Sequence, residues 1–272
     1  MSTQSEQLSH FRALHGPGRI LVLPNAWDAA SACMIQELGS EAIATSSAAV
    51  AWCHGYPDGD AIPTSIVLEA VREIIRVVSI PVSVDSEAGY SSDPQQVAGH
   101  VMSLIEAGVA GINIEDGTSA PDLLCAKIRV IKDAAKSKSA EIFINARCDV
   151  YLHDLAPDER KLEEAVRRGK LYADAGADGL FLPCMTDLAQ IRDAANATEL
   201  PLNILIMRAA PKVAELKAAG VRRVSAGALT GRAAYGQAYA ATRMLLNEGR
   251  YDAIFATSGD CPNFNGFFGW KN

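Results

Sequence analysis

The chain has 272 residues, of which 49% are apolar and 21% are charged, and its formal net charge is −7 at pH 7. That length suits one large core, and the acidic balance with scattered basic residues argues against nucleic-acid or membrane-surface binding. The six cysteines are widely spaced with no C-x-x-C pair, which argues against a disulfide framework and a zinc site. Because the first residues are polar and no apolar run could span a membrane, we expect a cytoplasmic protein whose partners are a small molecule and copies of itself.

Short β-branched runs alternate with amphipathic segments along the chain. The runs that predict strands are residues 20–23, 42–45, 81–85, 111–115, 142–146, 179–182, 202–205 and 223–226. The segments that predict helices are residues 64–78, 93–107, 158–175, 187–198, 210–219 and 230–247. This alternation predicts an α/β fold, a (β/α)8 TIM barrel in which residues 1–272 form a single domain. A doubly wound open sheet is the alternative, but its glycine-rich phosphate turn is missing, since Gly16-Pro17-Gly18 precedes the first strand.

The tail, residues 260–272, is rich in Gly and Asn and carries aromatic residues without helix or strand periodicity. They are Phe264, Phe267, Phe268 and Trp270. Aromatic side chains of this kind need a surface to cover. Two surfaces remain open at this point, the barrel of the same chain and a neighbouring subunit.

Polar side chains gather where three consecutive predicted strands end. Asp85 ends one strand and Glu87 follows it, while Glu115 ends the next. The strand after that ends in Asn145 and Arg147. Because the side chains at the carboxyl ends of barrel strands face the active site, we expect all of them to converge on one mouth of the barrel.

Crowded carboxylates repel one another, and a cation is the natural means of holding them together. Asp and Glu oxygens are hard ligands, and no His or Cys accompanies them at metal-ligand spacing, so the pattern favours Mg²⁺ or Mn²⁺. The adjacent Arg147 offers a fork for a substrate carboxylate or phosphonate. The alternative is a ring of salt bridges at the mouth, with Arg147 paired to Glu115.

Four other residues are weaker candidates. Ser46 and nearby backbone N–H groups could hold an anionic end of the substrate, or Ser46 could cap a helix. Asp58 lies in a Pro-Asp-Gly sequence typical of turns. Tyr90 could shield the site or pack under a loop, and Asn203 could contact the substrate or serve as a cap.

Several motifs stand in a recognisable order. The chain carries Ser46-Ser47-Ala48-Ala49-Val50-Ala51, Pro57-Asp58, Asp85-Ser86-Glu87-Ala88-Gly89-Tyr90, Ile112-Asn113-Ile114-Glu115-Asp116 and Ala146-Arg147-Cys148-Asp149. Together they resemble the isocitrate lyase/phosphoenolpyruvate mutase superfamily, in particular proteins similar to 2-methylisocitrate lyase and carboxyphosphonoenolpyruvate phosphonomutase. The resemblance runs over nearly the whole chain. The motifs are specific for the superfamily and not for one reaction.

The resemblance implies a (β/α)8 barrel whose last helix is swapped onto a partner subunit, in homodimers or homotetramers. It implies Mg²⁺ near Asp85, with Glu87 and Glu115 acting largely through bound water and Asp58 joining the acidic cluster.

For the substrate, the resemblance implies that Ser46 and the Ser47 backbone receive a carboxylate while Arg147 grips the other oxygens. Arg147, Glu115 and Asp58 are then the candidate catalytic residues. The shared chemistry makes or breaks a C–C or P–C bond next to an oxo or hydroxy acid, through a metal-stabilised enolate of the pyruvate or glyoxylate type.

The loop after the fourth strand departs from the resemblance. Lyases carry Lys-Lys-Cys-Gly-His there, whereas residues 117–127 place Cys125 in an apolar run that predicts a helix start and a buried thiol. Lys127 is the only cation in this loop, and the site where mutases have His after the sixth strand is Leu182-Pro183-Cys184-Met185.

We therefore expect a Mg²⁺-dependent lyase-type enzyme that cleaves a C–C bond in a small 2-oxo or 2-hydroxy carboxylate. One alternative is a P–C bond hydrolase or mutase that acts on phosphonopyruvate-like substrates. Another is a barrel that binds a 2-oxo acid without turnover.

Overall fold

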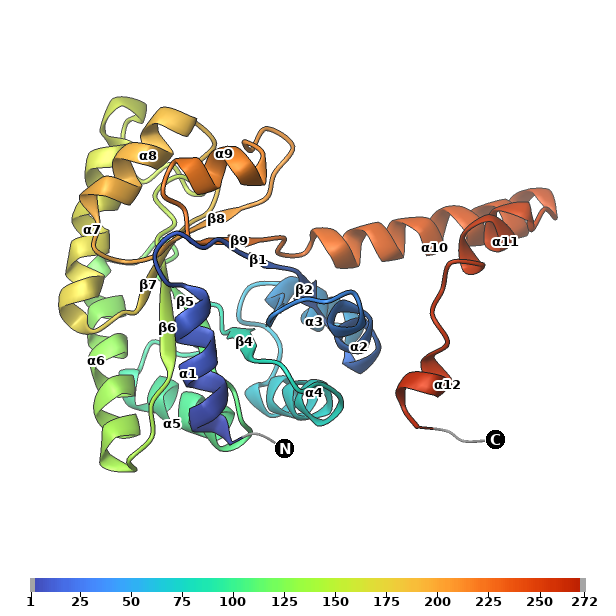
Figure 1. Cartoon of the computed structure of the whole chain (residues 1–272), viewed down its shortest axis with the longest axis horizontal. Coiled ribbons are helices and arrows are strands. Elements are labelled where there is room, and N and C mark those ends of the chain that lie inside the picture. Colours follow the sequence, from blue (N-terminus) through green and yellow to red (C-terminus); the bar gives the residue numbers. More distant parts are fainter. Residues whose placement is uncertain (1–2, 270–272) are drawn as a thin grey trace.

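The computed structural model describes residues 3–269, and in that range all strands are parallel and form one barrel (Figure 1). The first barrel strand is divided into β1 (Leu21–Leu23), which pairs with β9, and β2 (Asn25–Ala26), which pairs with β3. Pro24 separates the two pieces because it has no N–H to donate to a sheet. The other strands are β3 (Ile43–Thr45), β4 (Val82–Asp85), β5 (Gly111–Glu115), β6 (Phe143–Arg147), β7 (Gly179–Leu182), β8 (Leu202–Leu205) and β9 (Arg223–Ser225). The predicted strands and the predicted TIM barrel are confirmed.

Helices follow the strands and surround the barrel. They are α2 (Ala29–Glu37), α3 (Ser47–Cys53), α4 (Thr64–Val77), α5 (Pro94–Glu106), α6 (Pro121–Ser137), α7 (Lys161–Ala175), α8 (Leu188–Ala197) and α9 (Val213–Ala218). Two predicted helices begin later than expected. Residues 158–160 form a 3-10 turn before α7, and α9 starts after Pro211, since a proline disfavours helical backbone at the residue before it.

The helix α1 (Gln4–Leu14) closes the amino-terminal end of the barrel, a role that its polar sequence did not reveal. Its buried residues Leu8, Phe11 and Leu14 form a small core with β1, β3 and Phe143. The larger core lies between the barrel and the outer helices. Sealing the bottom leaves the carboxyl ends of the strands as the accessible face.

Inside the barrel, polar side chains replace part of the usual apolar filling. Asn145 donates through Nδ2 to Asn113 Oδ1 (2.9 Å) and to Asn203 Oδ1 (3.0 Å). The fully buried Arg223 donates to Asn113 Oδ1 (3.1 Å), and its guanidinium carbon lies 5.9 Å from the centre of the Phe11 ring. These amides form a rigid floor beneath the mouth, since buried polar groups held by mutual hydrogen bonds have few alternatives.

The C-terminal helices form an arm. Figure 1 shows α10 (Leu229–Glu248) running outward from the barrel, with α11 (Asp252–Ser258) folded against it and α12 (Phe264–Phe267) beyond. Apolar residues on the arm stay exposed, among them Leu229, Tyr235, Tyr239, Leu246, Tyr251 and Phe255. In the tail, Phe264 contacts Phe267 and Phe268, with ring centres 5.7 and 6.4 Å apart, and Trp270 lies outside the described residues. No helix in residues 3–269 is long and apolar enough to cross a membrane.

We expect the arm to pack on the barrel of a second copy. Val22, the middle residue of β1, is 44% exposed, although a helix ordinarily covers the outward side of a barrel strand. Light scattering should therefore give at least twice the 28.9 kDa chain mass. The double variant Tyr239→Ser, Leu246→Asp should lower that mass, while Gln237→Ala on the same helix should not; a wild-type monomer would contradict the swap.

Candidate active site

The carboxyl ends of β4, β5 and β6 bring the predicted polar residues to one mouth. In the register of the sheet, Asn113 lies opposite Asn145, and Glu115 lies opposite Arg147. Asp85 pairs with Asn113 across the neighbouring strands. The predicted convergence of these side chains is thus what parallel strands in this register produce.

Asp85 is held by the start of α3. Its Oδ2 accepts hydrogen bonds from Ser47 Oγ (2.9 Å) and Ser47 N–H (3.3 Å), and its own N–H donates to Thr45 Oγ1 (3.0 Å). Its second oxygen, Oδ1, is buried and has no hydrogen-bond partner among the described residues. A buried carboxylate oxygen without a donor is costly unless a cation or water completes it.

Glu87 lies in a tightly folded loop between β4 and α5. Its backbone is left-handed (φ 47°), and at Gly89 (φ 92°) a Cβ would approach Val97 to 2.7 Å, so the turn requires glycine there. Its Oε2 accepts from the Asp60 N–H, while Oε1 is buried with no partner among residues 3–269. Burial, with the charges of Asp60, Asp58 and Asp85, raises the pKa of Glu87 to about 7.

Glu115 and Arg147 form an ion pair, with Oε2 and Nη1 2.5 Å apart. This is the pair that the salt-bridge alternative requires. Burial raises the pKa of Glu115 to about 8 despite Arg147, because Asp85, Asp149 and Glu87 add negative charge nearby. Asp149 also shares the charge of Arg147, through contacts to Nε (2.7 Å) and Nη2 (3.0 Å). The guanidinium is therefore largely buried and held between two acids.

Two aspartates at the rim complete the acidic cluster. Burial and Asp85 raise the pKa of Asp58, while Arg147 and the Ser47 side chain lower it. This places Asp58 beside the cluster. Asp60 was missed, because Pro57-Asp58-Gly59 has the composition of a simple turn. Its N–H donates to Glu87, and its Oδ1 accepts from the Tyr90 N–H (3.1 Å).

The weaker candidates have structural partners. Ser46 caps α3, with Oγ accepting from the Ala49 N–H (3.4 Å). Asn203 lies in the barrel interior, where its Nδ2 donates to the Ile204 carbonyl (3.0 Å) and Oδ1 accepts from Asn145 (3.0 Å). A substrate-binding role for either residue stays a prediction.

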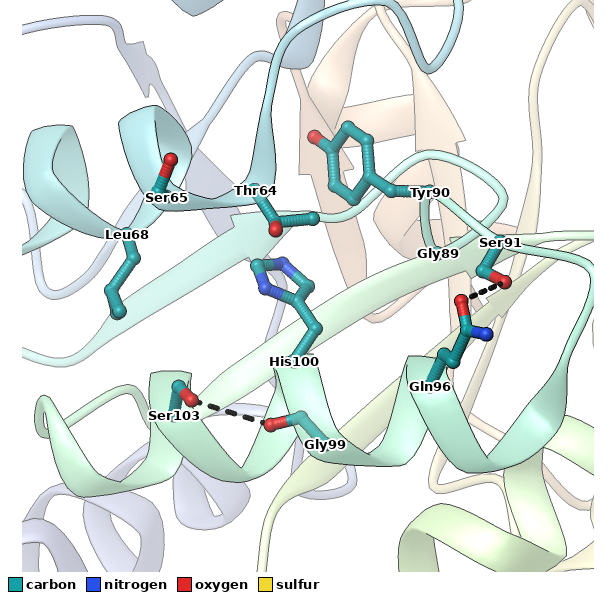
Figure 2. A pocket seen from close by; sticks show the side chains of 10 residues that line it. All are labelled: Thr64, Ser65, Leu68, Gly89, Tyr90, Ser91, Gln96, Gly99, His100 and Ser103. Atoms are coloured by element: carbon teal, nitrogen blue, oxygen red, sulfur yellow. Dashed lines mark hydrogen bonds between the residues drawn. The ribbon is translucent and has the colours of Figure 1, made fainter.

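Tyr90 lies between the acidic cluster and a polar cavity of about 350 Å³ that is framed by α4, α5 and the loop at residues 89–91. Figure 2 shows its ring above Thr64, and the ring packs edge-on against His100 with centres 5.4 Å apart. Burial and the charges of Glu87 and Asp85 raise the pKa of the Tyr90 phenol, so it stays protonated. It separates cavity from cluster, which fits a shielding role.

The divergent loop is short and leads directly into α6. Cys125 is buried there, as expected, with Sγ 3.6 Å from the Leu171 carbonyl. Lys127 is also buried, and its Nζ donates to the Ala88 carbonyl (2.6 Å). It braces the loop that carries Glu87, so it is not a free cation for a substrate.

The cluster can hold a divalent cation only in part through direct contacts. No three His, Cys, Asp or Glu side chains in the described range lie close enough to hold one ion together. The unpartnered oxygens of Asp85 and Glu87 are oxygen ligands of the kind Mg²⁺ prefers. Since Mg²⁺ keeps several of its waters, one carboxylate contact with others made through water fits these residues.

Comparison with known families identifies the chain. The family described as phosphoenolpyruvate phosphomutase matches residues 11–246. The chain belongs to this family. It is therefore a member of the isocitrate lyase/phosphoenolpyruvate mutase superfamily, as its motifs indicated.

Relatives in this family carry different names. An uncharacterized protein of Mycobacterium tuberculosis is 37% identical over 80% of this chain and 82% of its own. The 2-methylisocitrate lyase of Escherichia coli is 30% identical over 70% of each chain, and the oxaloacetate decarboxylase of Pseudomonas paraeruginosa is 31% identical over 92% and 87%. A solved candidate phosphonomutase of Burkholderia cenocepacia is 37% identical, covers 88% of this chain and 99% of its own, and has a TM-score of 0.83. The relatives with named activities are enzymes of this superfamily, which supports the interpretation of this chain as an enzyme of the same superfamily.

The raised pKa values of Glu87 and Glu115 predict a loss of stability with rising pH in chelator-treated protein. Above pH 6.5 the unfolded chain has released these protons, while the folded protein keeps them until pH passes about 7 and 8, so stability should fall across that window. The neutral buried His15 and His100, with pKa values of about 3 and 4, oppose this trend only at lower pH. Thermal unfolding from pH 6.5 to 8.5 checks it. Glu115→Gln should weaken the dependence of the melting temperature on pH. A melting temperature that rises from pH 6.5 to 8.5 would contradict the prediction.

Proposed function

We propose that the protein is a Mg²⁺-dependent lyase-type enzyme that cleaves a C–C bond in a small 2-oxo or 2-hydroxy carboxylate. One observation carries the proposal: unpartnered buried oxygens of Asp85 and Glu87 lie in the same charged cluster as the Arg147 guanidinium, whose Nη1 faces Glu115 without a hydrogen bond. A bound cation would offset the carboxylates of Asp85 and Glu87, and the carboxylate of an organic acid would pair with Arg147. Together they would satisfy the charged groups of the cluster.

Asp85 would hold the cation directly, with Glu87, Glu115 and Asp58 engaged through water. When bound, the cation offsets the acids and acts as a Lewis acid toward substrate oxygens. Mn²⁺ would serve with the same ligands.

The chain's own side chains do the rest. Arg147 would bind and orient one carboxylate of the substrate. Ser46 and the Ser47 N–H, which the substrate would share with Asp85, would receive the oxygens at the other end of the substrate. Glu115, beside Arg147, would take or return a proton at the substrate. Asp58 is exposed and would line the entrance to the site. Tyr90, whose N–H donates to Asp60, would cover one side of the cluster and help to exclude water.

A P–C bond hydrolase or mutase is the second candidate, favoured by the likeness to the candidate phosphonomutase. The position of Lys127 argues against it. A phosphonate dianion needs more positive charge than a carboxylate, and this buried lysine donates to Ala88 behind the loop. Arg147 and the cation would then have to supply all the positive charge that the phosphonate needs.

A substrate panel with and without Mg²⁺ tests the proposal. Oxaloacetate and 2-methylisocitrate should release pyruvate in a metal-dependent manner, since each can leave a stabilised enolate. Phosphate release from phosphonopyruvate would support the second candidate instead. Tight oxalate binding without turnover of any acid in the panel would point to a non-catalytic binding protein.

A further inference from the structure

Arg147 is gripped side-on by a carboxylate that lies outside the acidic cluster. Asp149 is fully buried, and its two oxygens accept from Nε (2.7 Å) and Nη2 (3.0 Å), while Glu115 contacts Nη1. A guanidinium carries five N–H groups. The two hydrogen bonds to Asp149 leave three N–H groups, and the ion pair of Nη1 with Glu115 forms no hydrogen bond, so at least two N–H groups remain for a bidentate contact with one substrate carboxylate.

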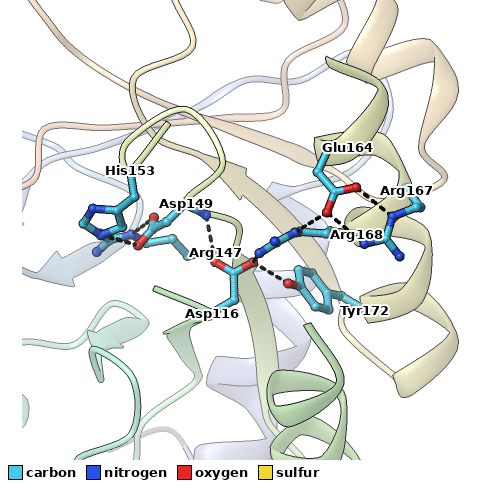
Figure 3. A network of polar contacts seen from close by, with 8 residues as sticks. All are labelled: Asp116, Arg147, Asp149, His153, Glu164, Arg167, Arg168 and Tyr172. Atoms are coloured by element: carbon cyan, nitrogen blue, oxygen red, sulfur yellow. Dashed lines mark hydrogen bonds and ion pairs between the residues drawn. The ribbon is translucent and has the colours of Figure 1, made fainter. Parts of the chain in front are cut away.

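Asp149 is in turn fixed by Asp116. The Asp149 N–H donates to Asp116 Oδ1 (2.8 Å), and the Asp116 N–H donates to the Arg147 carbonyl (3.1 Å), so Asp116 holds both ends of this short segment. Its other oxygen, Oδ2, accepts from Arg168 Nη1 (2.7 Å) and from the Tyr172 hydroxyl. Figure 3 shows Asp116 between the segment with Asp149 and the face of α7.

The network ends on the outer helix α7. Arg168 Nε donates to Glu164 Oε1 (2.8 Å), and Glu164 also accepts from Arg167. Glu164, Arg168 and Tyr172 are spaced by four residues and therefore share one helix face. His153 is another titratable side chain in the described range that faces Asp149, with Nε2 3.8 Å from Oδ2.

We propose that Asp149 is a positioning residue for Arg147, and that Asp116 and Tyr172 hold Asp149 in place. The inference rests on the proposed role of Arg147 in binding the substrate carboxylate. Without the side-on pair, the attraction of Glu115 and Asp85 draws the guanidinium into the acidic cluster and commits its free N–H groups there. Asp149 holds the guanidinium at a fixed angle at the edge of the cluster, in contact with Glu115, because a bidentate carboxylate defines the plane of its partner.

The substitution Asp149→Asn tests the proposal, since an asparagine sets an NH₂ donor against a guanidinium N–H. Two measurements follow it. In ¹⁵N NMR, the Arg147 Nε–H signal, assigned through its loss in Arg147→Lys, should exchange slowly in the wild type and fast in Asp149→Asn. In calorimetry with Mg²⁺ present, the Kd of oxalate should rise about tenfold or more.

Asp252→Asn is the matched control. Asp252 accepts side-on from Arg250, through Nε (3.1 Å) and Nη2 (2.9 Å), with the same Arg-x-Asp spacing but at an exposed place on the arm. This variant should change neither measurement. Tyr172→Phe removes a single hydroxyl and is the second variant in case Asp149→Asn does not fold. It should raise the Kd of oxalate about two- to fivefold.

An unchanged Nε–H exchange rate in Asp149→Asn, or an unchanged Kd in both variants, would overturn the inference. Failure of the proposed function would give a different set of results. In that case the wild type itself would not bind oxalate, while the exchange measurement would still report on the grip of Asp149.

Discussion

Replacing Asp85 with alanine should abolish Mg²⁺ binding and, with it, Mg²⁺-dependent binding of oxalate. One oxygen of Asp85 is fixed by two hydrogen bonds, from Ser47 N–H and Oγ, while its other buried oxygen lacks a partner among the described residues. That arrangement prepares one oxygen for a cation. Removing it leaves only acids that engage the ion through water.

Thermal unfolding measures this effect without any assay of activity. A ligand at a hundredfold excess over its Kd stabilises the folded state by about 2.7 kcal/mol, so the wild type should melt a few degrees higher with Mg²⁺. Asp85→Ala and the isosteric Asp85→Asn should show no such shift, whereas Asp158→Ala, at an exposed acid that begins the 3-10 turn, should keep it. An undiminished Mg²⁺ shift in both Asp85 variants would remove the metal assignment.

Replacing Arg147 with methionine should abolish substrate binding and destabilise the fold together. The fully buried Asp149 would lose its ion-pair partner, and breaking a buried pair on one side costs about 3–5 kcal/mol. Denaturant unfolding measures that loss. Arg147→Lys keeps the charge but loses the fork, so it should recover much of the stability and little of the oxalate affinity.

The double variant Arg147→Met, Asp149→Asn separates the two effects. Removing both charges should restore most of the lost stability, because no buried charge is left unpaired, while binding stays absent. Should the double variant instead be as unstable as Arg147→Met, the ion pair is not what Arg147 contributes to folding.

The barrel was predictable because its strands carry strong local signals. Gly179–Leu182 is buried throughout and is a continuous apolar stretch, while Gly111–Glu115 is a buried run with isoleucines on either side of Asn113 and a carboxylate at its end. The helix α1 was not predictable in the same way. Its few buried residues lie among many polar ones, and their role appears only when Phe143 and β1 come together beneath them.

The candidate site also contains residues that the sequence revealed and one that it did not. Asp85, Glu87, Glu115 and Arg147 stood out because charged residues end otherwise apolar strands, and strand ends meet at one mouth. Asp60 carried no such signal. It lies in a turn-like sequence far from the strands, and only its contacts with Glu87 and Tyr90 reveal it.

The sequence by itself determined the barrel, the family and the acids at its mouth, because periodicity, strand-end charges and motif order are local properties of the chain. Only the tertiary structure decided how those charges are paired. How Arg147 divides its ion pairs between Glu115 and Asp149 depends on the orientation of side chains on neighbouring strands and on one face of α7. Such pairing is a balance of burial and distance in three dimensions, and neither quantity is written in the order of the residues.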